Sequence, residues 1–172
     1  MRLGIDIDGV VRDFATAADS KFGAPIQTGE YDLTARYGDA EYVKRLFHGD
    51  LVVPVFTDAD VIDGAYDLVW LLDRWSVRTG NSWIFVSAQP TALHEALTRE
   101  WVWRNLSHKA DIRFFASQAD KWRAADVLLD DNPAALDAFA SHGHTAIGFD
   151  REYNRGWQGE RITQHEEIFN HL

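Results

Sequence analysis

Two aspartates, Asp6 and Asp8, close a short apolar segment at the start of the chain, Leu3-Gly4-Ile5-Asp6-Ile7-Asp8. Alternate residues of a strand point to the same side of a sheet, so we expect both carboxylates to begin on one side. Carboxylates held this close repel each other unless a cation or a shared proton lies between them. Gly9 permits the tight turn by which the chain leaves the sheet. The segment predicts a metal-assisted active site, and an Asp-rich turn without chemistry is the alternative.

Later apolar segments also end in polar side chains. Ser87 closes one of them, and Asp130 and Asp131 close another; Lys121 lies just ahead of the second. Because ligands of open α/β sheets bind beyond the carboxyl ends of the strands, we expect these groups to meet the N-terminal aspartates. Oxygen ligands of this kind suit Mg²⁺, a carboxylate can attack phosphorus, and a hydroxyl and an amine can hold phosphoryl oxygens. The set predicts phosphoryl transfer.

The elements that must position these groups alternate between strands and helices. Buried strands are predicted for the N-terminal segment and for 83–86, 112–115, 127–129 and 145–149. Helices are predicted after Asp63, along Leu93, Leu97 and Trp101, and from Asn132-Pro133 to Gly143. Ser117 and Asp120 resemble a capping box that would place Lys121 in the first turn of a short helix. This alternation is typical of an α/β fold with a parallel sheet.

The interval between Gly9 and Ser82 is too long for a loop and has helix signals of its own. One predicted helix runs over 14–22, and a second follows Asp39 and ends before Gly49. We therefore expect a mostly helical cap, residues 14–76, inserted into a core made of residues 1–13 and 77–172.

Composition narrows the class of protein. The 172 residues are 46% hydrophobic, with seven Trp and ten Phe, which is ample for a packed core. A formal net charge of −10 disfavours long nucleic acids as partners. The absence of cysteine excludes disulfides, thiolate metal sites and a cysteine nucleophile. With no apolar leader and no stretch long enough to cross a membrane, we expect a cytoplasmic protein, either a monomer or a homodimer.

Four motifs, in this order, resemble those of the haloacid dehalogenase-like phosphatases. They are Asp6-x-Asp8-Gly9-Val10, Ser87 after an apolar strand, Lys121, and Leu128-Leu129-Asp130-Asp131. The resemblance spans nearly the whole chain and implies a Rossmann-like parallel sheet with flanking helices and a small helical cap after the first strand. Within that superfamily the chain is most similar to the 5′(3′)-deoxyribonucleotidases. The similarity lies in Asp8-Gly9-Val10-x-x-Asp13-Phe14, in Phe56 to Ala65 and in the Trp101-Val102 helix.

The resemblance implies a role for each matching acid. Asp6 would attack phosphorus, and Asp8 would protonate the leaving alkoxide and then activate the hydrolytic water. Mg²⁺ would be held by the Asp6 carboxylate, the Asp8 backbone carbonyl and Asp130. Asp131 would be a direct or water-mediated partner of the same ion.

The resemblance also implies a substrate site. Ser87 and Lys121 would bind phosphoryl oxygens, and Phe14 and Phe56 match positions that line a pocket for the base. In one departure, Ala88-Gln89-Pro90 follows Ser87 where the family often has a second hydroxyl. The implied activity is Mg²⁺-dependent hydrolysis of nucleoside monophosphates, deoxynucleotides first among them. Other phosphomonoesters, such as a sugar phosphate or the 3′-phosphate end of a nucleic acid, are the alternative.

Every one of these residues also has an ordinary structural interpretation. Asp130 and Asp131 could serve only as a loop and helix cap, Lys121 could be a solvated surface lysine, and Phe14 and Phe56 could be core. A phosphoacceptor signalling module also combines acids, Mg²⁺, a hydroxyl and a lysine. Its lysine follows the hydroxyl on the last strand, whereas Lys121 precedes a further acidic pair.

Overall fold

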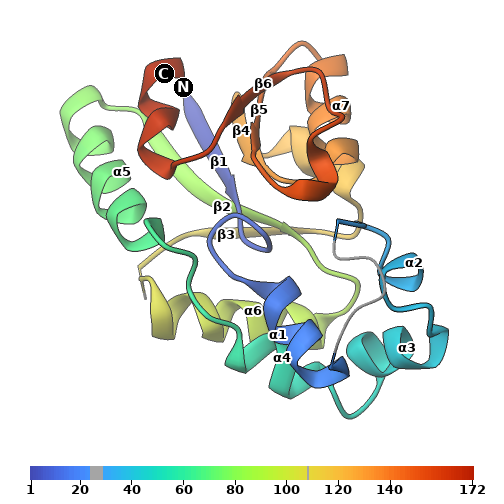
Figure 1. Ribbon diagram of the computed structural model, residues 1–172. Coiled ribbons are helices and arrows are strands. Elements are labelled where there is room, and N and C mark those ends of the chain that lie inside the picture. The colour runs from blue at the N-terminus through green and yellow to red at the C-terminus, as the bar shows by residue number, and fades with distance from the viewer. Residues whose placement is uncertain (24–28, 108) are drawn as a thin grey trace.

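The computed structural model describes residues 1–23, 29–107 and 109–172, and a six-stranded parallel sheet lies at its centre (Figure 1). The strand order is β3-β2-β1-β4-β5-β6, which places β1 between β2 and β4. The strands are β1 (Arg2–Asp6), β2 (Ser82–Ala88), β3 (Ile112–Phe115), β4 (Val127–Asp130), β5 (Thr145–Phe149) and β6 (Glu160–Ile162). The predicted parallel α/β sheet is confirmed. The edge strand β6 was not predicted, because its three residues Glu-Arg-Ile form no apolar run.

Helices cover both faces of the sheet. On one face Leu3 and Ile5 of β1 pack in a cluster with α5 (Ala65–Thr79) and α6 (Ala92–Asn105). The other face carries α7 (Pro133–Ser141), whose Phe139 packs in a second cluster with Leu128. Side chains that alternate along each strand are therefore buried on both sides, as a parallel sheet requires.

Side-chain caps set the starts of the predicted helices. Asp13 accepts from the Thr16 amide at the start of α1 (Phe14–Phe22), and Asp39 accepts from the Tyr42 amide at the start of α3 (Ala40–His48). The remaining helices are α2 (Leu33–Tyr37), α4 (Val52–Asp58), and the 3₁₀ helices η1 (Gln118–Arg123), η2 (Glu152–Asn154) and η3 (His165–His171).

The short helix that follows Ser117 differs from its prediction. The Ser117 hydroxyl accepts from the Ala119 amide, as a cap should, but the helix is the 3₁₀ helix η1. Lys121 lies in its last turn, not in its first. A 3₁₀ helix has three residues per turn, so Lys121, the fourth of the six residues of η1, belongs to its second and last turn.

Helices α1 to α4 gather beside the carboxyl ends of the strands, apart from α5 and α7 (Figure 1). They share an apolar cluster of their own, which includes Ala18, Tyr42, Leu46 and Val55. Helix α5, in contrast, packs in the same cluster as β1. We therefore propose that the inserted cap ends before α5, and that the core resumes near residue 60 rather than at 77.

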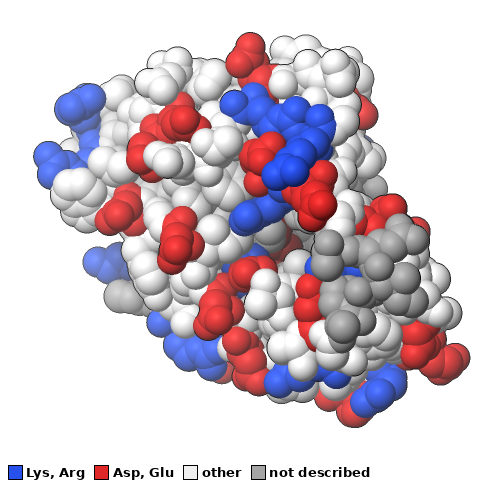
Figure 2. Space-filling view, viewed as in Figure 1, with Lys and Arg blue, Asp and Glu red and all other residues white. Residues whose placement is uncertain are grey.

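Acidic side chains are spread over the visible face of the molecule, with basic side chains in separate groups among them (Figure 2). Weak affinity for long nucleic acids stays a prediction. Within the described parts of the chain, none of the helices has both the length and the apolar character needed to cross a membrane.

Candidate active site

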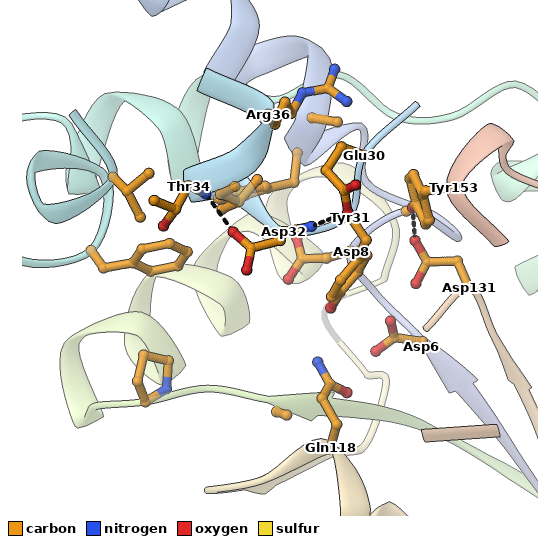
Figure 3. Close-up of a pocket in the computed structure, with 18 of the residues that line it drawn as sticks. Asp6, Asp8, Glu30, Tyr31, Asp32, Thr34, Arg36, Gln118, Asp131 and Tyr153 are labelled. Atoms are coloured by element: carbon orange, nitrogen blue, oxygen red, sulfur yellow. Dashed lines mark hydrogen bonds between the residues drawn. The ribbon is translucent and has the colours of Figure 1, made fainter. Parts of the chain in front are cut away.

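Three carboxylates meet at the carboxyl edge of the sheet. Asp6 is the last residue of β1 and Asp130 the last of β4, and these neighbouring strands run parallel. Asp131 follows directly. One carboxylate oxygen from each of the three lies within 4.8 Å of the others, and all three residues are buried. Figure 3 shows Asp6 and Asp131 on adjacent sides of this site.

Lys121 reaches into the same group from η1. Its Nζ donates to Asp6 Oδ1 and to Asp130 Oδ2, both at 2.8 Å, and its side chain is fully buried. Burial by itself lowers the pKa of Lys121, but Asp130 and Asp6 outweigh this effect and raise it. The lysine is therefore a permanent cation beneath the site.

The acids carry more negative charge than Lys121 balances. Burial, followed by the charge of Asp130, raises the pKa of Asp6 well above its usual range, although Lys121 acts in the opposite direction. Burial and Asp130 also raise the pKa of Asp131, to about 7. When all three carboxylates are ionised, the single ammonium leaves two negative charges, which a divalent cation with oxygen ligands would offset. The donor set therefore fits Mg²⁺.

Asp8 lies apart from this group and has a different cation. Arg12 holds its carboxylate with two bonds, Nε to Oδ1 at 2.7 Å and Nη2 to Oδ2 at 2.9 Å. Gln89 Nε2 donates to the same Oδ2 at 3.1 Å. Asp6 and Asp8 therefore have different cationic partners in the structure, Lys121 for Asp6 and Arg12 for Asp8. A role for the Asp8 backbone carbonyl in holding the metal stays a prediction.

Gly9 is required by the packing of this site. Its φ is +79°, a conformation that side chains disfavour. A Cβ atom at this position would lie 1.7 Å from Asp131 Oδ2 and 2.9 Å from the Tyr153 hydroxyl oxygen. The turn after β1 can therefore approach the second acidic pair only with glycine at this position.

Ser87 lies on β2, next to β1, and is buried. Its hydroxyl accepts from Gln89 Nε2 at 2.9 Å, so one amide group joins Ser87 and Asp8. Gln89 and Ala88 line the cavity above. The Gln89 side chain thus lies beside Ser87 and Asp8 at the edge of the cavity.

A cavity of about 460 Å³ opens beside the acids, between the sheet edge and helices α1 to α4. Phe14 and Phe56 both line it, together with Val43 and Phe47. The rings of Phe14 and Phe47 are stacked, with centroids 6.2 Å apart and planes at 24°, and Phe56 meets Phe14 edge-on at 5.3 Å. One wall of the cavity is therefore aromatic. Glu30, Tyr31, Asp32 and Thr34 supply polar groups to the lining of the same cavity (Figure 3).

Sequence reasoning missed two tyrosines at this site. The Tyr153 hydroxyl donates to Asp131 Oδ2, and Asn132 Nδ2 donates to the Tyr31 hydroxyl. The two rings are 5.3 Å apart (Figure 3). Tyr153 follows the last predicted strand, so the rule that found the other site residues would have found it. For Tyr31 the sequence offers no such signal.

Solved structures of other proteins share the fold of this chain at low sequence identity. No family model matches the sequence, and no curated protein matches it. Similar solved structures include a "predicted phosphatase" from Clostridium acetobutylicum, at TM-score 0.65 and 13% identity over 98% of each chain. CbbY from Rhodobacter sphaeroides in complex with phosphate aligns at TM-score 0.58 and 16% identity, over 97% of this chain and 95% of that one. L-2-haloacid dehalogenase from Xanthobacter autotrophicus aligns at 0.59 and 9%, over 97% and 96%.

Proposed function

We propose that this chain, which has the haloacid dehalogenase-like fold, is a Mg²⁺-dependent phosphomonoesterase acting on nucleoside monophosphates, deoxynucleotides first among them. One observation carries the proposal. The Asp6 carboxylate shares a buried site with Lys121, Asp130 and Asp131, directly beside a cavity large enough for a small phosphorylated molecule.

In the proposed reaction an Asp6 carboxylate oxygen attacks phosphorus, and the bond from phosphorus to the leaving oxygen breaks. Asp8 gives that oxygen a proton. Asp8 then takes a proton from water, and the water oxygen attacks the phosphorus of the aspartyl-phosphate. The bond from phosphorus to Asp6 breaks, which releases inorganic phosphate and restores the carboxylate. Ser87 and Lys121 hold phosphoryl oxygens during both steps.

Asp6, Asp130 and Asp131 would hold Mg²⁺, together with the Asp8 backbone carbonyl. When bound, the ion supplies positive charge that offsets the charge of the phosphoryl group. Its binding also offsets the excess negative charge of the three buried acids, which supports this assignment independently of the reaction.

The cavity supports a substrate with a flat apolar part. A base can stack on an aromatic wall, and Phe14, Phe47 and Phe56 supply one. Sugar phosphates are the second candidate, because CbbY from R. sphaeroides, TM-score 0.57, has been crystallised with xylulose-1,5-bisphosphate. The carboxylates of Glu30 and Asp32 in the cavity lining would repel a second phosphate, which favours monophosphates.

A substrate panel tests the proposal. It contains nucleoside 5′- and 3′-monophosphates, sugar phosphates and a 3′-phosphorylated oligonucleotide, each with Mg²⁺ and with a chelator. We expect kcat/KM for the best deoxynucleotide to exceed that for any sugar phosphate by about tenfold or more, since burial of a base contributes at least 1 to 2 kcal/mol. The chelator should abolish release of phosphate. Preference for sugar phosphates or for the oligonucleotide would contradict the nucleotidase assignment.

Binding of Mg²⁺ should weaken as the pH falls. The pKa of Asp131 is raised to about 7, so below that pH the ion must displace a proton from this carboxyl. We expect the affinity to fall by about tenfold per pH unit for each proton that the ion displaces, from Asp131 below pH 7 and also from Asp6, whose pKa is raised as well. Isothermal titration calorimetry between pH 5.5 and 8, in two buffers of different ionisation enthalpy, measures both the affinity and the proton released. An affinity that does not change between pH 5.5 and 7 would show that Asp131 is ionised without the metal.

A further inference from the structure

We propose that Arg12 is the residue that positions the Asp8 carboxylate for proton transfer, and that it does so from a buried position behind the wall of the substrate cavity. This inference rests on the proposed function, in which Asp8 is the acid and base. Arg12 matches none of the motifs that carry the family resemblance.

Arg12 is a fully buried cation whose guanidinium has one carboxylate partner among the described residues, Asp8. Burying a charge costs several kcal/mol unless the charge is paired and hydrogen-bonded. Besides the two bonds to Asp8, Nη2 donates to Thr98 Oγ1 at 3.0 Å and Nη1 to the Phe56 carbonyl oxygen at 3.5 Å. An apolar side chain could fill this place in the core without that cost. The guanidinium is therefore explained by its two bonds to the Asp8 carboxylate.

Two parallel bonds fix a carboxylate more completely than a single contact does. The two bonds from Arg12 Nε and Nη2, here called the Arg12 fork, set both the position and the plane of the Asp8 carboxylate. Lysine would supply a point charge without fixing that plane. The Asp8 side chain keeps 30% of its surface exposed and lines the cavity, so part of it remains accessible from the space for substrate.

Arg12 also ties that orientation to the cavity wall. Its guanidinium carbon lies 4.9 Å from the ring centroid of Phe56 and 5.4 Å from that of Trp101. Phe56 belongs to α4 and lines the cavity, and Thr98 and Trp101 belong to α6. Arg12 therefore fixes the position of the Asp8 carboxylate relative to Phe56, the part of the cavity wall on which the leaving group of the substrate would rest.

The dependence on leaving group separates positioning from a purely structural role. An alkoxide leaves a phosphate ester only if it is protonated, whereas 4-nitrophenolate leaves without a proton. If Arg12 aims the acid, its loss should slow the hydrolysis of a nucleoside monophosphate much more than that of 4-nitrophenyl phosphate. Damage to the fold would slow both reactions alike.

The experiment compares kcat/KM for the two substrates in wild type, Arg12→Lys, Arg12→Met and Asp8→Asn. General acid catalysis contributes about 10² to 10⁴-fold, so we expect Arg12→Lys to lose about 100-fold on the nucleotide and less than about tenfold on the nitrophenyl ester. Asp8→Asn should shift the ratio in the same direction and further. Arg45→Lys is the matched control, because Arg45 binds Asp50 through the same two kinds of bond, Nε to Oδ1 and Nη2 to Oδ2, at an exposed position, and it should keep the ratio within about twofold.

The possible results distinguish a failure of the Arg12 inference from a failure of the proposed phosphatase mechanism. A wild type that hydrolyses neither ester, or an unchanged ratio in Asp8→Asn, would overturn the proposed mechanism itself. An unchanged ratio in folded Arg12 variants beside a changed one in Asp8→Asn would overturn the role of Arg12, as would an equal change in Arg45→Lys. If both Arg12 variants fail to fold, a crystal structure of the wild type with Mg²⁺ and vanadate tests whether Arg12 holds Asp8 in the loaded site. The fork should persist, and an Asp8 carboxylate turned away from Arg12 would refute the inference.

Discussion

Replacing Asp6 with asparagine is expected to abolish release of phosphate while leaving the protein folded. An amide cannot form the aspartyl-phosphate, and the loss of a covalent nucleophile typically costs about 10⁴-fold or more in kcat. The fold should tolerate the change, because burial and neighbouring acids raise the pKa of Asp6 and so make its ionised form unfavourable. The amide oxygen can still accept from Lys121.

Release of inorganic phosphate and thermal unfolding measure the two effects. Asp73→Asn is a matched control, because Asp73 lies on α5, far along the chain from the site, and its side chain accepts from Trp83 Nε1. The control should retain the wild-type rate. If Asp6→Asn kept more than about one per cent of wild-type kcat, Asp6 would not be the nucleophile.

Replacing Lys121 with methionine is expected to lower the free energy of unfolding of the metal-free protein by about 3 to 5 kcal/mol at pH 7, the usual cost of breaking a buried ion pair. Nζ is the cation in contact with Asp6 and Asp130, and its removal leaves buried carboxylates without a partner. Mg²⁺ should restore part of this loss. The loss should also shrink at pH 5, because the pKa values of Asp6 and Asp131 are raised and protonation then relieves their repulsion.

Denaturant unfolding with and without Mg²⁺, at both pH values, measures this prediction. Lys44→Met is the control, since Lys44 and Glu41 form an exposed pair at 3.7 Å. Such pairs contribute about 0 to 1 kcal/mol, so the control should be nearly neutral. Equal stability of Lys121→Met and the wild type in the metal-free state would mean that Lys121 does not compensate the buried acids.

Much of the fold could be predicted from local sequence. Five of the six strands are apolar runs, and the caps Asp13, Asp39 and Asn132 mark helix starts, because both signals act over a few residues. The position of Asp6 and Asp130 at one edge followed as well, because parallel strands end on the same side. The strand β6 and the 3₁₀ geometry around Lys121 depend on neighbours distant in sequence, and local patterns do not report them.

The orientation of Asp8 shows where sequence reasoning reaches its limit. Alternation along a strand placed Asp8 on the side of Asp6, but β1 ends at Asp6. From there the chain turns around the Ile7 carbonyl oxygen, which accepts from the Val11 and Arg12 amides at 2.9 Å each. Within such a turn the strand rule no longer applies, and the Asp8 carboxylate meets Arg12 instead.

The sequence by itself determined the elements of this protein and the chemical groups at the ends of its strands. Local propensities and the two-residue period of strands are enough for that. Only the tertiary structure decided which cation belongs to which acid, Lys121 to Asp6 and Asp130, and Arg12 to Asp8. It also decided that Tyr153 contacts Asp131. The physical reason is that long side chains reach their partners through the packing of several elements, which no spacing along the chain records.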